Sequence, residues 1–347
     1  MRWLAVVLLP AVLHADPLPV ARAREGFALA RQLADADHGR LWGRPLGGPL
    51  LFADPSTRAV VADEPDGEGL LHAEGGAYSG KLPDNVTIAN TAVEWAGKRW
   101  TMVMWPLPDA RYARGRLLAH ELFHRLQPDL GIPATNPANA HLDGMDGRIW
   151  LQLEWRALSE ALVRKGDLRR AAAQDALVFR AERRALAGAG AAEEERALEL
   201  NEGLAEYTGY RLCGLPEEVL PDRVAARLDG APTNGLSRGF AYLSGPAYGL
   251  LLDGAAPRWR AKLSAASDLG ELLRGALGFR LPADLAAEAR AHAKRYDGDA
   301  LIAAENQREE ERRARLDGYR KLFVDGPVLR VPFGPAANYS YDPASRP

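Results

Sequence analysis

The most constraining feature of this chain is the segment His120-Glu121-Leu122-Phe123-His124. A step of four residues turns a helix by about 400°, so the two imidazoles project from one face, one turn apart. At that separation both can bind one zinc ion, and Glu121 can reach a water in the open coordination position. The sequence therefore predicts a catalytic zinc site with His120 and His124 as ligands and Glu121 as general base.

The residues around this motif have the pattern of a helix. Asp109 can cap its start, Pro128 can end it, and the apolar positions between them recur at helical spacing. The side chains expected on the buried side are Tyr112, Leu118, Leu122 and Leu126. The alternative is that the two histidines belong to a surface or a core and bind no metal.

Composition limits the class of protein. The chain has 347 residues, 47% of them hydrophobic, which is enough for one or two domains with a real core. The formal charge is −2 with acidic and basic residues mixed, so we expect no nucleic-acid partner. Cys213 is the single cysteine, which excludes an intramolecular disulfide. Because a structural zinc site needs four ligands, mostly Cys and His, this composition favours a catalytic site with one zinc ion.

The N-terminus has the pattern of a secretory signal. Arg2 gives a positive start, Trp3 to Leu13 form an apolar run too short to span a bilayer, and Ala15 is a plausible cleavage site. The alternative for residues 1–15 is a buried helix. With the signal removed, we expect no membrane span and an exported protein, either periplasmic or extracellular; the pattern leaves the oligomeric state open.

The predicted fold class is α+β, with a small N-terminal sheet followed by a mostly helical domain. A helix is expected at 18–36. Gly97 should lie in the turn of a hairpin between the last two strands. The last strand should lead directly into the metal helix, and 16–128 should form the N-terminal α/β part with a mixed or antiparallel sheet packed on that helix. The predicted strands are 49–53, 58–62, 86–95 and 99–105.

Residues 129–321 should form the helical domain, and 322–347 a β-like tail. The patterns at 148–165 and 167–187 predict an antiparallel pair of helices joined near Gly166. Strand-like runs in the tail lie at 328–332 and 339–341. The other predicted helices are 193–210, 237–252, 261–278, 283–296 and the charged segment 305–321.

Two histidines and a water leave one zinc ligand to be found. Glu202 shares a helix face with small residues, which would let its helix approach another backbone closely. The competing interpretation is that Glu195, Glu199, Glu202 and Glu206 form a solvated face. A rival ligand is Glu154, which lies among apolar residues and therefore needs zinc or an arginine as partner.

Three further residues have weaker assignments. Glu206, one turn after Glu202, could accept a hydrogen bond from the ring N–H of His120 or His124. His141 and Asp143 lie in the polar loop after the metal helix, where they could line a cleft or simply form part of the surface.

The motif His-Glu-x-x-His followed by Asn201-Glu202-Gly203-x-Ala-x-Tyr resembles the gluzincin (peptidase-MA-like) zinc metallopeptidases, nearest to the catalytic domain of the aminopeptidase N type. The resemblance implies a zincin-like fold and Glu202 as the third zinc ligand. The segment that begins at Tyr242 and includes Gly245 is similar to the family's Tyr-x-x-Gly-Ala segment. The resemblance therefore implies that Tyr242 stabilises the oxyanion, with Tyr248 and Tyr207 as competitors.

The resemblance covers roughly residues 98–252. His124 and Glu202 are separated by 77 residues, far more than in that family, and the helical pair 148–187 could be the insertion. The Gly-x-Met-Glu-Asn segment that grips a free amino terminus is absent, so aminopeptidase specificity is not expected.

The expected function is a secreted zinc metallopeptidase that acts on a peptide or protein substrate. In the resembling family an edge strand beside the metal helix pairs with extended peptide, and 99–105 is the expected equivalent. Two alternatives stay open. One is a zinc hydrolase of another amide or ester, since deformylases share the His-Glu-x-x-His motif; the other is a non-catalytic exported helical binding protein.

Overall fold

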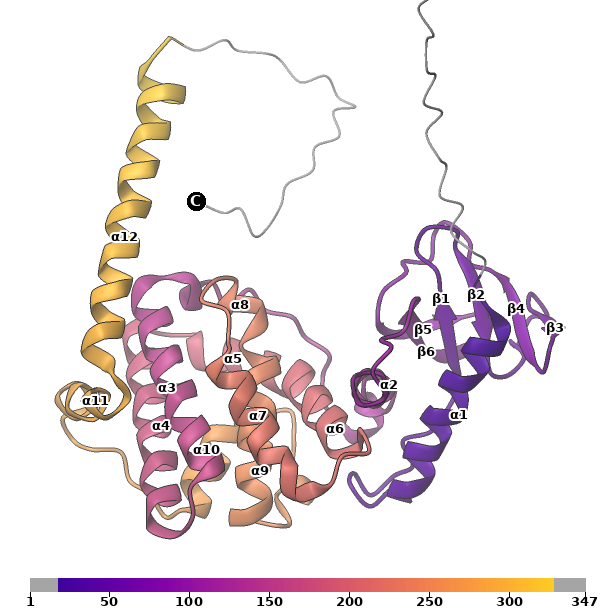
Figure 1. Cartoon of the computed structure of the whole chain (residues 1–347), viewed down its shortest axis with the longest axis horizontal. Coiled ribbons are helices and arrows are strands. Elements are labelled where there is room, and N and C mark those ends of the chain that lie inside the picture. The colour runs from indigo at the N-terminus through magenta and orange to yellow at the C-terminus, as the bar shows by residue number, and fades with distance from the viewer. Residues whose placement is uncertain (1–17, 328–347) are drawn as a thin grey trace, which may run out of the picture. The chain divides into compact units, whose positions relative to one another are not determined.

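The computed structural model describes residues 18–327, and they divide into two compact units (Figure 1). The first unit comprises the described residues up to Arg40 together with Arg44–Arg125. The second comprises Leu41–Gly43 and the described residues from Leu126 onward. The first contains a sheet and the second is helical, so the predicted α+β class is confirmed. The predicted signal at 1–15 and the strand-like runs of the tail lie outside the described residues.

The first unit contains a mixed six-stranded sheet. Its strand order is β3-β4-β2-β1-β6-β5, with β1 and β6 parallel and the other neighbours antiparallel. As predicted, the hairpin between β5 and β6 turns at Gly97, which has φ of 73°. The strands are β1 Leu50–Ala53, β2 Ala59–Ala62, β3 His72–Glu74, β4 Ala77–Lys81, β5 Thr91–Trp95 and β6 Lys98–Met104.

The sequence patterns missed β3 and β4. All three residues of β3 are exposed, and β4 has only one buried residue, so neither carries the apolar alternation that identifies a strand. The strand expected at 86–95 is shorter than predicted and begins at Thr91.

The prediction that 99–105 is an edge strand is wrong. The corresponding strand, β6, pairs with β1 on one side and β5 on the other, so both rows of its backbone groups are used within the sheet. Its burial on both faces is typical of an inner strand. The edge beyond β6 is formed by β5.

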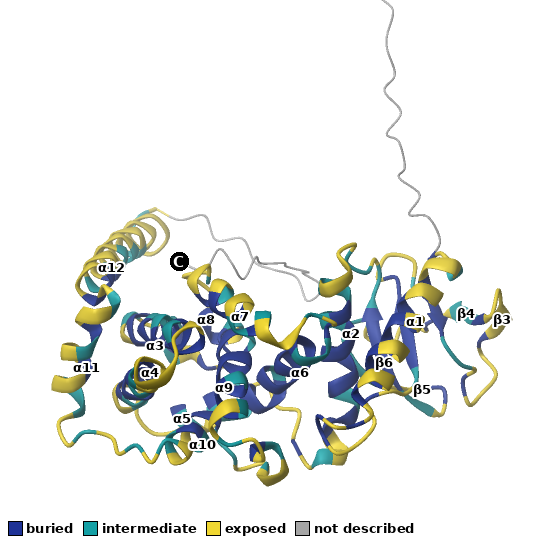
Figure 2. Cartoon of the chain, turned by 60° about the horizontal axis from the view of Figure 1, so that its bottom comes forward, coloured by how far each residue is buried: buried dark blue, intermediate teal, exposed yellow. Residues whose placement is uncertain are grey.

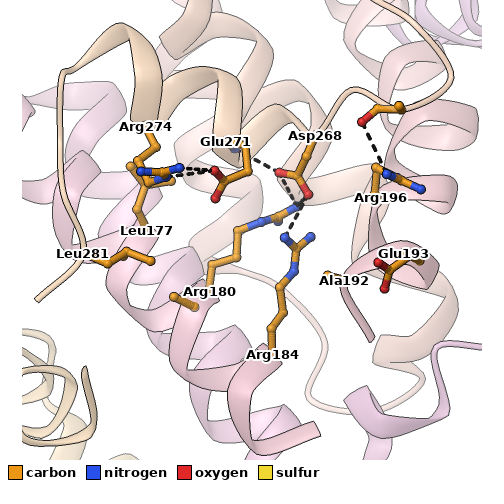
Figure 3. Close-up of a pocket in the computed structure, with 12 residues that line it drawn as sticks. Leu177, Arg180, Arg184, Ala192, Glu193, Arg196, Asp268, Glu271, Arg274 and Leu281 are labelled. Atoms are coloured by element: carbon orange, nitrogen blue, oxygen red, sulfur yellow. Dashed lines mark hydrogen bonds and ion pairs between the residues drawn. The ribbon is translucent and has the colours of Figure 1, made fainter. Parts of the chain in front are cut away.

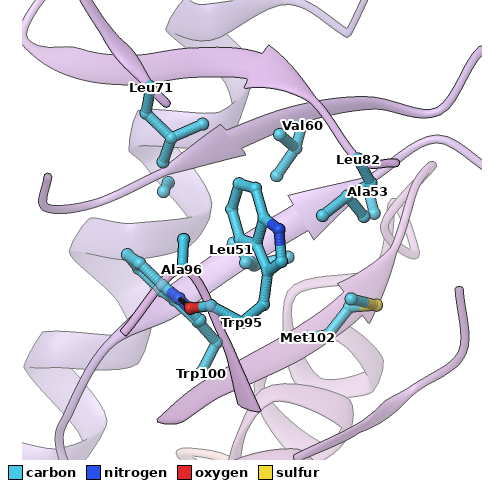
Figure 4. Close-up of a cluster of buried hydrophobic side chains, with 10 residues drawn as sticks. Leu51, Ala53, Val60, Leu71, Leu82, Trp95, Ala96, Trp100 and Met102 are labelled. Atoms are coloured by element: carbon cyan, nitrogen blue, oxygen red, sulfur yellow. Dashed lines mark hydrogen bonds between the residues drawn. The ribbon is translucent and has the colours of Figure 1, made fainter. Parts of the chain in front are cut away.

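Alternating side chains of the sheet pack into an apolar core on one face, shown in Figure 4. Trp100 lies in this core and its indole N–H donates to the carbonyl of Trp95 at 3.0 Å. On the opposite face Phe52 of β1 stacks against Phe27 of α1 (Val20–Asp37), with ring centroids 4.6 Å apart. The helix predicted at 18–36 is therefore confirmed.

The motif helix α2 spans Arg111–Leu126 and follows β6 as predicted. Arg111 donates to Gln32 of α1, and Arg125 donates to the carbonyls of Leu46 and Gly47, just before β1. Both ends of α2 are thus tied to its own unit. After Leu126 the chain continues as a short 3-10 turn, η1 (Gln127–Leu130).

The predicted buried side of α2 is largely correct. Leu118, Leu122 and Leu126 are buried, but Tyr112 is 48% exposed and that part of the prediction is wrong. Tyr112 lies in the first turn of the helix. A helical repeat alone does not reveal how far along a helix the packing partner extends.

The second unit is a bundle of helices around a buried centre, and Figure 2 shows the dark buried sides of α3, α4 and α9. The predicted antiparallel pair is α3 and α4, joined at Gly166, which has φ of 56°. The helices are α3 Met145–Val163, α4 Gly166–Ala187, α5 Ala191–Leu198, α6 Leu204–Leu212, α7 Leu220–Asp229, α8 Leu236–Gly239, α9 Ala241–Ala255, α10 Leu269–Ala276, α11 Leu285–Ala293 and α12 Gly298–Arg320.

Short turns complete the unit. The 3-10 turns beyond η1 are η2 Ala140–Asp143, η4 Glu217–Val219, η5 Trp259–Lys262 and η6 Lys294–Tyr296, and the π-helical turns are η3 Glu199–Gly203 and η7 Lys321–Asp325. Helix α7 was not predicted, because Pro221 suggests a break although proline is favoured in the first turn of a helix. Within 18–327, no helix is long and apolar enough to cross a bilayer.

Candidate metal centre

Helix α2 places the two motif histidines side by side. His120 and Glu121 are buried and His124 is half-buried. The Nε2 atoms of His120 and His124 lie 3.2 Å apart. Two nitrogens bound to one tetrahedral zinc at about 2.0 Å would lie about 3.3 Å apart, so this spacing fits a shared ion. The helical step of four residues thus produces the geometry that the motif predicts.

The acidic residue of the motif lies next to the same nitrogens. Oε1 of Glu121 is 3.9 Å from Nε2 of His120. A carboxylate at this position could accept a proton from a water held near the histidine nitrogens, which is the geometric requirement for a general base.

Glu202 lies on a π-helical turn. Helix α5, the turn η3 and helix α6 follow one another without a break, so the single helix predicted at 193–210 is interrupted by one wider turn. Such turns occur often at functional sites because they displace a side chain from its regular helical direction. Sequence periodicity does not reveal them.

The turn η3 packs closely against α9. Gly203 and Gly245 face each other there, and a Cβ added at Gly245 would lie 2.3 Å from the Cα of Gly203. The segment of Glu202 therefore approaches another backbone closely at Gly203, whereas the approach was expected from Ala205 and Gly209, the small residues on the face of Glu202. The same contact brings Tyr242, one turn before Gly245 on α9, beside the turn.

Both carboxylate oxygens of Glu202 accept hydrogen bonds within the second unit. The hydroxyl of Tyr242 donates to Oε2 at 2.6 Å, and Nδ2 of Asn201 donates to Oε1 at 3.2 Å. Each carboxylate oxygen has about two lone-pair directions, so a metal can still be bound.

The three predicted ligands offer donor atoms that could hold a metal ion: an imidazole nitrogen each from His120 and His124 in the first unit, and a carboxylate oxygen of Glu202 in the second. Two imidazoles and one carboxylate, with a fourth position for water, form a common ligand set of catalytic zinc sites. The donor chemistry of these residues therefore fits zinc.

Glu154, the rival ligand, has other partners. Its carboxylate accepts hydrogen bonds from Arg183, from Tyr248 at 2.7 Å and from Arg180 at 3.3 Å. The buried charge is therefore balanced by arginines from α4. Of the two partners expected for Glu154, zinc or an arginine, the structure shows arginine.

The interpretation of four glutamates as a solvated face is wrong. Glu195, Glu199 and Glu206 are buried. Arg180 binds Glu199 through both terminal nitrogens, and Arg183 binds Glu195 in the same two-point manner. Helical spacing of acids indicates a common face but does not show whether that face meets water or arginines.

Asp268 joins this ion network from α10's N-terminus, and Figure 3 shows Arg180 and Arg184 converging on it. Burial raises the pKa of Asp268, but the two arginines outweigh burial and hold it well below its usual range. Burial likewise raises the pKa of Glu195, and Arg183 together with His141 holds it well below normal. Both carboxyls are therefore charged at neutral pH.

The other candidates have structural partners. Tyr207 donates to Asp253 and Tyr248 to Glu154, and burial raises the pKa of both tyrosines well above the usual value. Both fit the description of core tyrosines. Glu206 accepts a hydrogen bond from Arg227 at 2.5 Å.

The two loop residues also have partners in the second unit. Nε2 of His141 lies 2.9 Å from Oε1 of Glu195, and Oδ1 of Asp143 accepts the backbone N–H groups of Leu236 and Ser237. His141 thus belongs to the edge of the ion network, and Asp143 to the start of α8.

Two residues next to the motif segments were not singled out from the sequence. Asn201 contacts Glu202 directly, and Gln127 donates to Asn201 at 3.0 Å. Asn201 is part of the segment that carries the family resemblance, which is the signal that could have drawn attention to it. Nothing in the sequence around Gln127 indicates that its side chain is buried.

Comparisons with protein-family models, curated proteins and solved structures gave no match to this chain. The class of site described here therefore depends on the residues themselves and their geometry.

Proposed function

We propose that this chain is an exported zinc-dependent metallopeptidase whose ligands are His120, His124 and Glu202. The observation that carries the proposal is the pair of imidazole Nε2 atoms 3.2 Å apart on α2, with the Glu121 carboxylate beside them. Glu202 completes a donor set that could hold a metal ion. Zinc bound by these residues would supply a Lewis acid and would lower the pKa of a bound water to about 7.

The chain's own residues would carry the proton transfers. Glu121, buried beside His120, takes a proton from the attacking water as the water oxygen adds to the substrate carbonyl carbon. It then passes that proton to the amine as the C–N bond breaks. Tyr242 stands beside Glu202 and is the candidate for orienting the ligand or for stabilising the developing oxyanion.

The peptide substrate and the export are the parts of the proposal that depend on sequence resemblance. Because β6 is an inner strand, it cannot be the edge strand that was expected to pair with a peptide. Its neighbour β5 forms the edge of the sheet. Export is supported by the apolar run from Trp3 to Leu13 after Arg2. Hydrolysis of another amide or ester would use the same zinc site. A non-catalytic binding protein, by contrast, would not need a zinc site.

The first experiment measures zinc content and hydrolysis of the purified chain. We expect one zinc per chain, and cleavage of a quenched peptide library that stops on addition of a chelator and returns with zinc. Glu121→Gln should keep the zinc and lower the rate at least ~10²-fold, the usual effect of removing a general base.

Glu160→Gln is the matched control, because Glu160 lies on α3 and its charge pairs with Arg164 on the surface. It should change neither zinc content nor rate. A chain that binds no zinc would exclude the proposal. Zinc binding without cleavage of any peptide, but with chelator-sensitive cleavage of simple esters or amides, would favour the other hydrolase class.

A further inference from the structure

A chain of buried amides runs from the end of the motif helix to Glu202. Gln127 follows His124 by three residues and is completely buried, and Asn201 immediately precedes Glu202. Nε2 of Gln127 donates to Oδ1 of Asn201 at 3.0 Å, and Nδ2 of Asn201 donates to Oε1 of Glu202 at 3.2 Å. These contacts all lie within the second unit.

The direction of this amide chain is determined by one backbone carbonyl. Nε2 of Gln127 also donates to the carbonyl oxygen of Pro133 at 3.0 Å. Since a carbonyl oxygen can only accept, the amide nitrogen of Gln127 must face it, and the same NH2 group presents its second hydrogen to Asn201. Asn201 must then turn its oxygen toward Gln127 and its nitrogen toward Glu202.

The loop after α2 holds Gln127 in place. The backbone carbonyl of Gln127 accepts from the N–H of Ile132 at 3.2 Å, so 127–133 folds back on itself. Asn136, further along the same loop, accepts from Nδ2 of Asn201 at 3.0 Å. Each amide is thus oriented by at least two neighbours, and neither can turn over without losing buried hydrogen bonds.

From these contacts we infer that Gln127 and Asn201 are positioning residues for the third zinc ligand. Asn201 presents an N–H donor to one carboxylate oxygen of Glu202, and Gln127 orients Asn201, so that the carboxylate is held in a single orientation. Loss of a donor of this kind to a metal-binding carboxylate typically lowers metal affinity or activity 10–100-fold. The inference rests on the proposed function, because it concerns the same zinc site.

The test measures zinc affinity of the full chain by competition with a chromophoric chelator. Asn201→Leu should raise the zinc dissociation constant about 10–100-fold, and Gln127→Met should raise it less, because Gln127 acts only through Asn201. The double variant should match Asn201→Leu alone, since the two residues act in series. Visible spectra of the cobalt-loaded variants should differ from that of the unmodified chain, because they report ligand geometry.

Thr208→Val is the matched control. Thr208 is as buried as Gln127, and its hydroxyl accepts from Trp42 and donates to the carbonyl of Leu204 on the same helix as the ligand segment. We expect Thr208→Val to lower the melting temperature by about as much as the two amide variants do, and to leave zinc affinity and the cobalt spectrum unchanged.

The outcomes separate this inference from the proposed function. Absence of zinc binding by the unmodified chain would remove both. Normal zinc affinity in Asn201→Leu, or an equal loss in Thr208→Val, would remove the positioning role alone. Additive losses in the double variant would also contradict it, because two independent packing defects add.

Discussion

Tyr242 has one hydroxyl proton, and in this structure that proton is donated to Oε2 of Glu202. A tyrosine hydroxyl cannot donate to the carboxylate of Glu202 and to a substrate oxygen at the same time. The two roles considered for Tyr242 therefore predict different effects when the hydroxyl is removed.

We expect Tyr242→Phe to raise the zinc dissociation constant about 10–100-fold, because Glu202 loses the donor that orients it. The measurement is chelator competition together with kcat and KM for a cleaved peptide. Unchanged zinc affinity with a fall in kcat of about 10²–10³ would instead assign Tyr242 to the oxyanion.

Tyr248→Phe is the comparison for this experiment. Tyr248 is a buried tyrosine of the same helix, but its hydroxyl donates to Glu154 in the ion network. Loss of this hydroxyl should lower the stability by about 1–3 kcal/mol, the contribution of one hydrogen bond to a charged group, without a change in zinc affinity.

At the scale of elements, the contact between η3 and α9 determines where Glu202 and Tyr242 meet. Gly203 and Gly245 leave no room for a side chain, since a Cβ at Gly245 would also lie 2.6 Å from the carbonyl oxygen of Gly203. Because the obstructing atoms belong to the backbone, they cannot move aside as a flexible side chain would.

We expect Gly245→Ala to displace α9 from the turn, to lower stability by about 1–3 kcal/mol and to weaken zinc binding. Gly254→Ala on the same helix is the control, because a Cβ there meets nothing within 4 Å. It should be neutral or raise stability by up to about 1 kcal/mol. Urea unfolding and zinc competition measure both; equal effects at the two positions would argue against the close contact.

At the scale of the whole molecule, the two units should differ in their response to pH. Burial raises the pKa of Asp63 in the first unit to about 6, while the backbone N–H of Leu50 opposes this. The folded chain then binds more protons than the unfolded chain between about pH 4 and 6. Stability of the first unit should therefore fall as pH rises through this window.

Asp63→Asn should remove that fall, because the amide oxygen can still accept from Leu50 and carries no charge. With about 1.4 kcal/mol for each pH unit of pKa difference, the wild-type loss is at most about 3 kcal/mol. Hydrogen exchange of the amides in β1 and β6 measures it. Exchange in α4 of the second unit is the control. If exchange in β1 depended on pH in the same way in the unmodified chain and in Asp63→Asn, Asp63 would not be the group responsible.

The local features of this chain could be predicted because each depends on a repeat within one element. The step from His120 to His124, the apolar side of α2 and the pair α3 and α4 all follow from helical periodicity. The predictions failed where a partner elsewhere decides the outcome. Exposed β3 has no pattern of its own, and β6 became an inner strand because β1 and β5 both pair with it.

The sequence by itself determined the two histidines, the neighbouring acid and the alternation of sheet and helices, since these depend on residue type and local spacing. The family resemblance had pointed to Glu202 as the third ligand, but only the tertiary structure showed that Glu154, Glu195 and Glu199 are bound by arginines of α4. A carboxylate's role depends on which charges surround it once the chain has folded. Those neighbours come from distant parts of the sequence, where no local repeat reveals them.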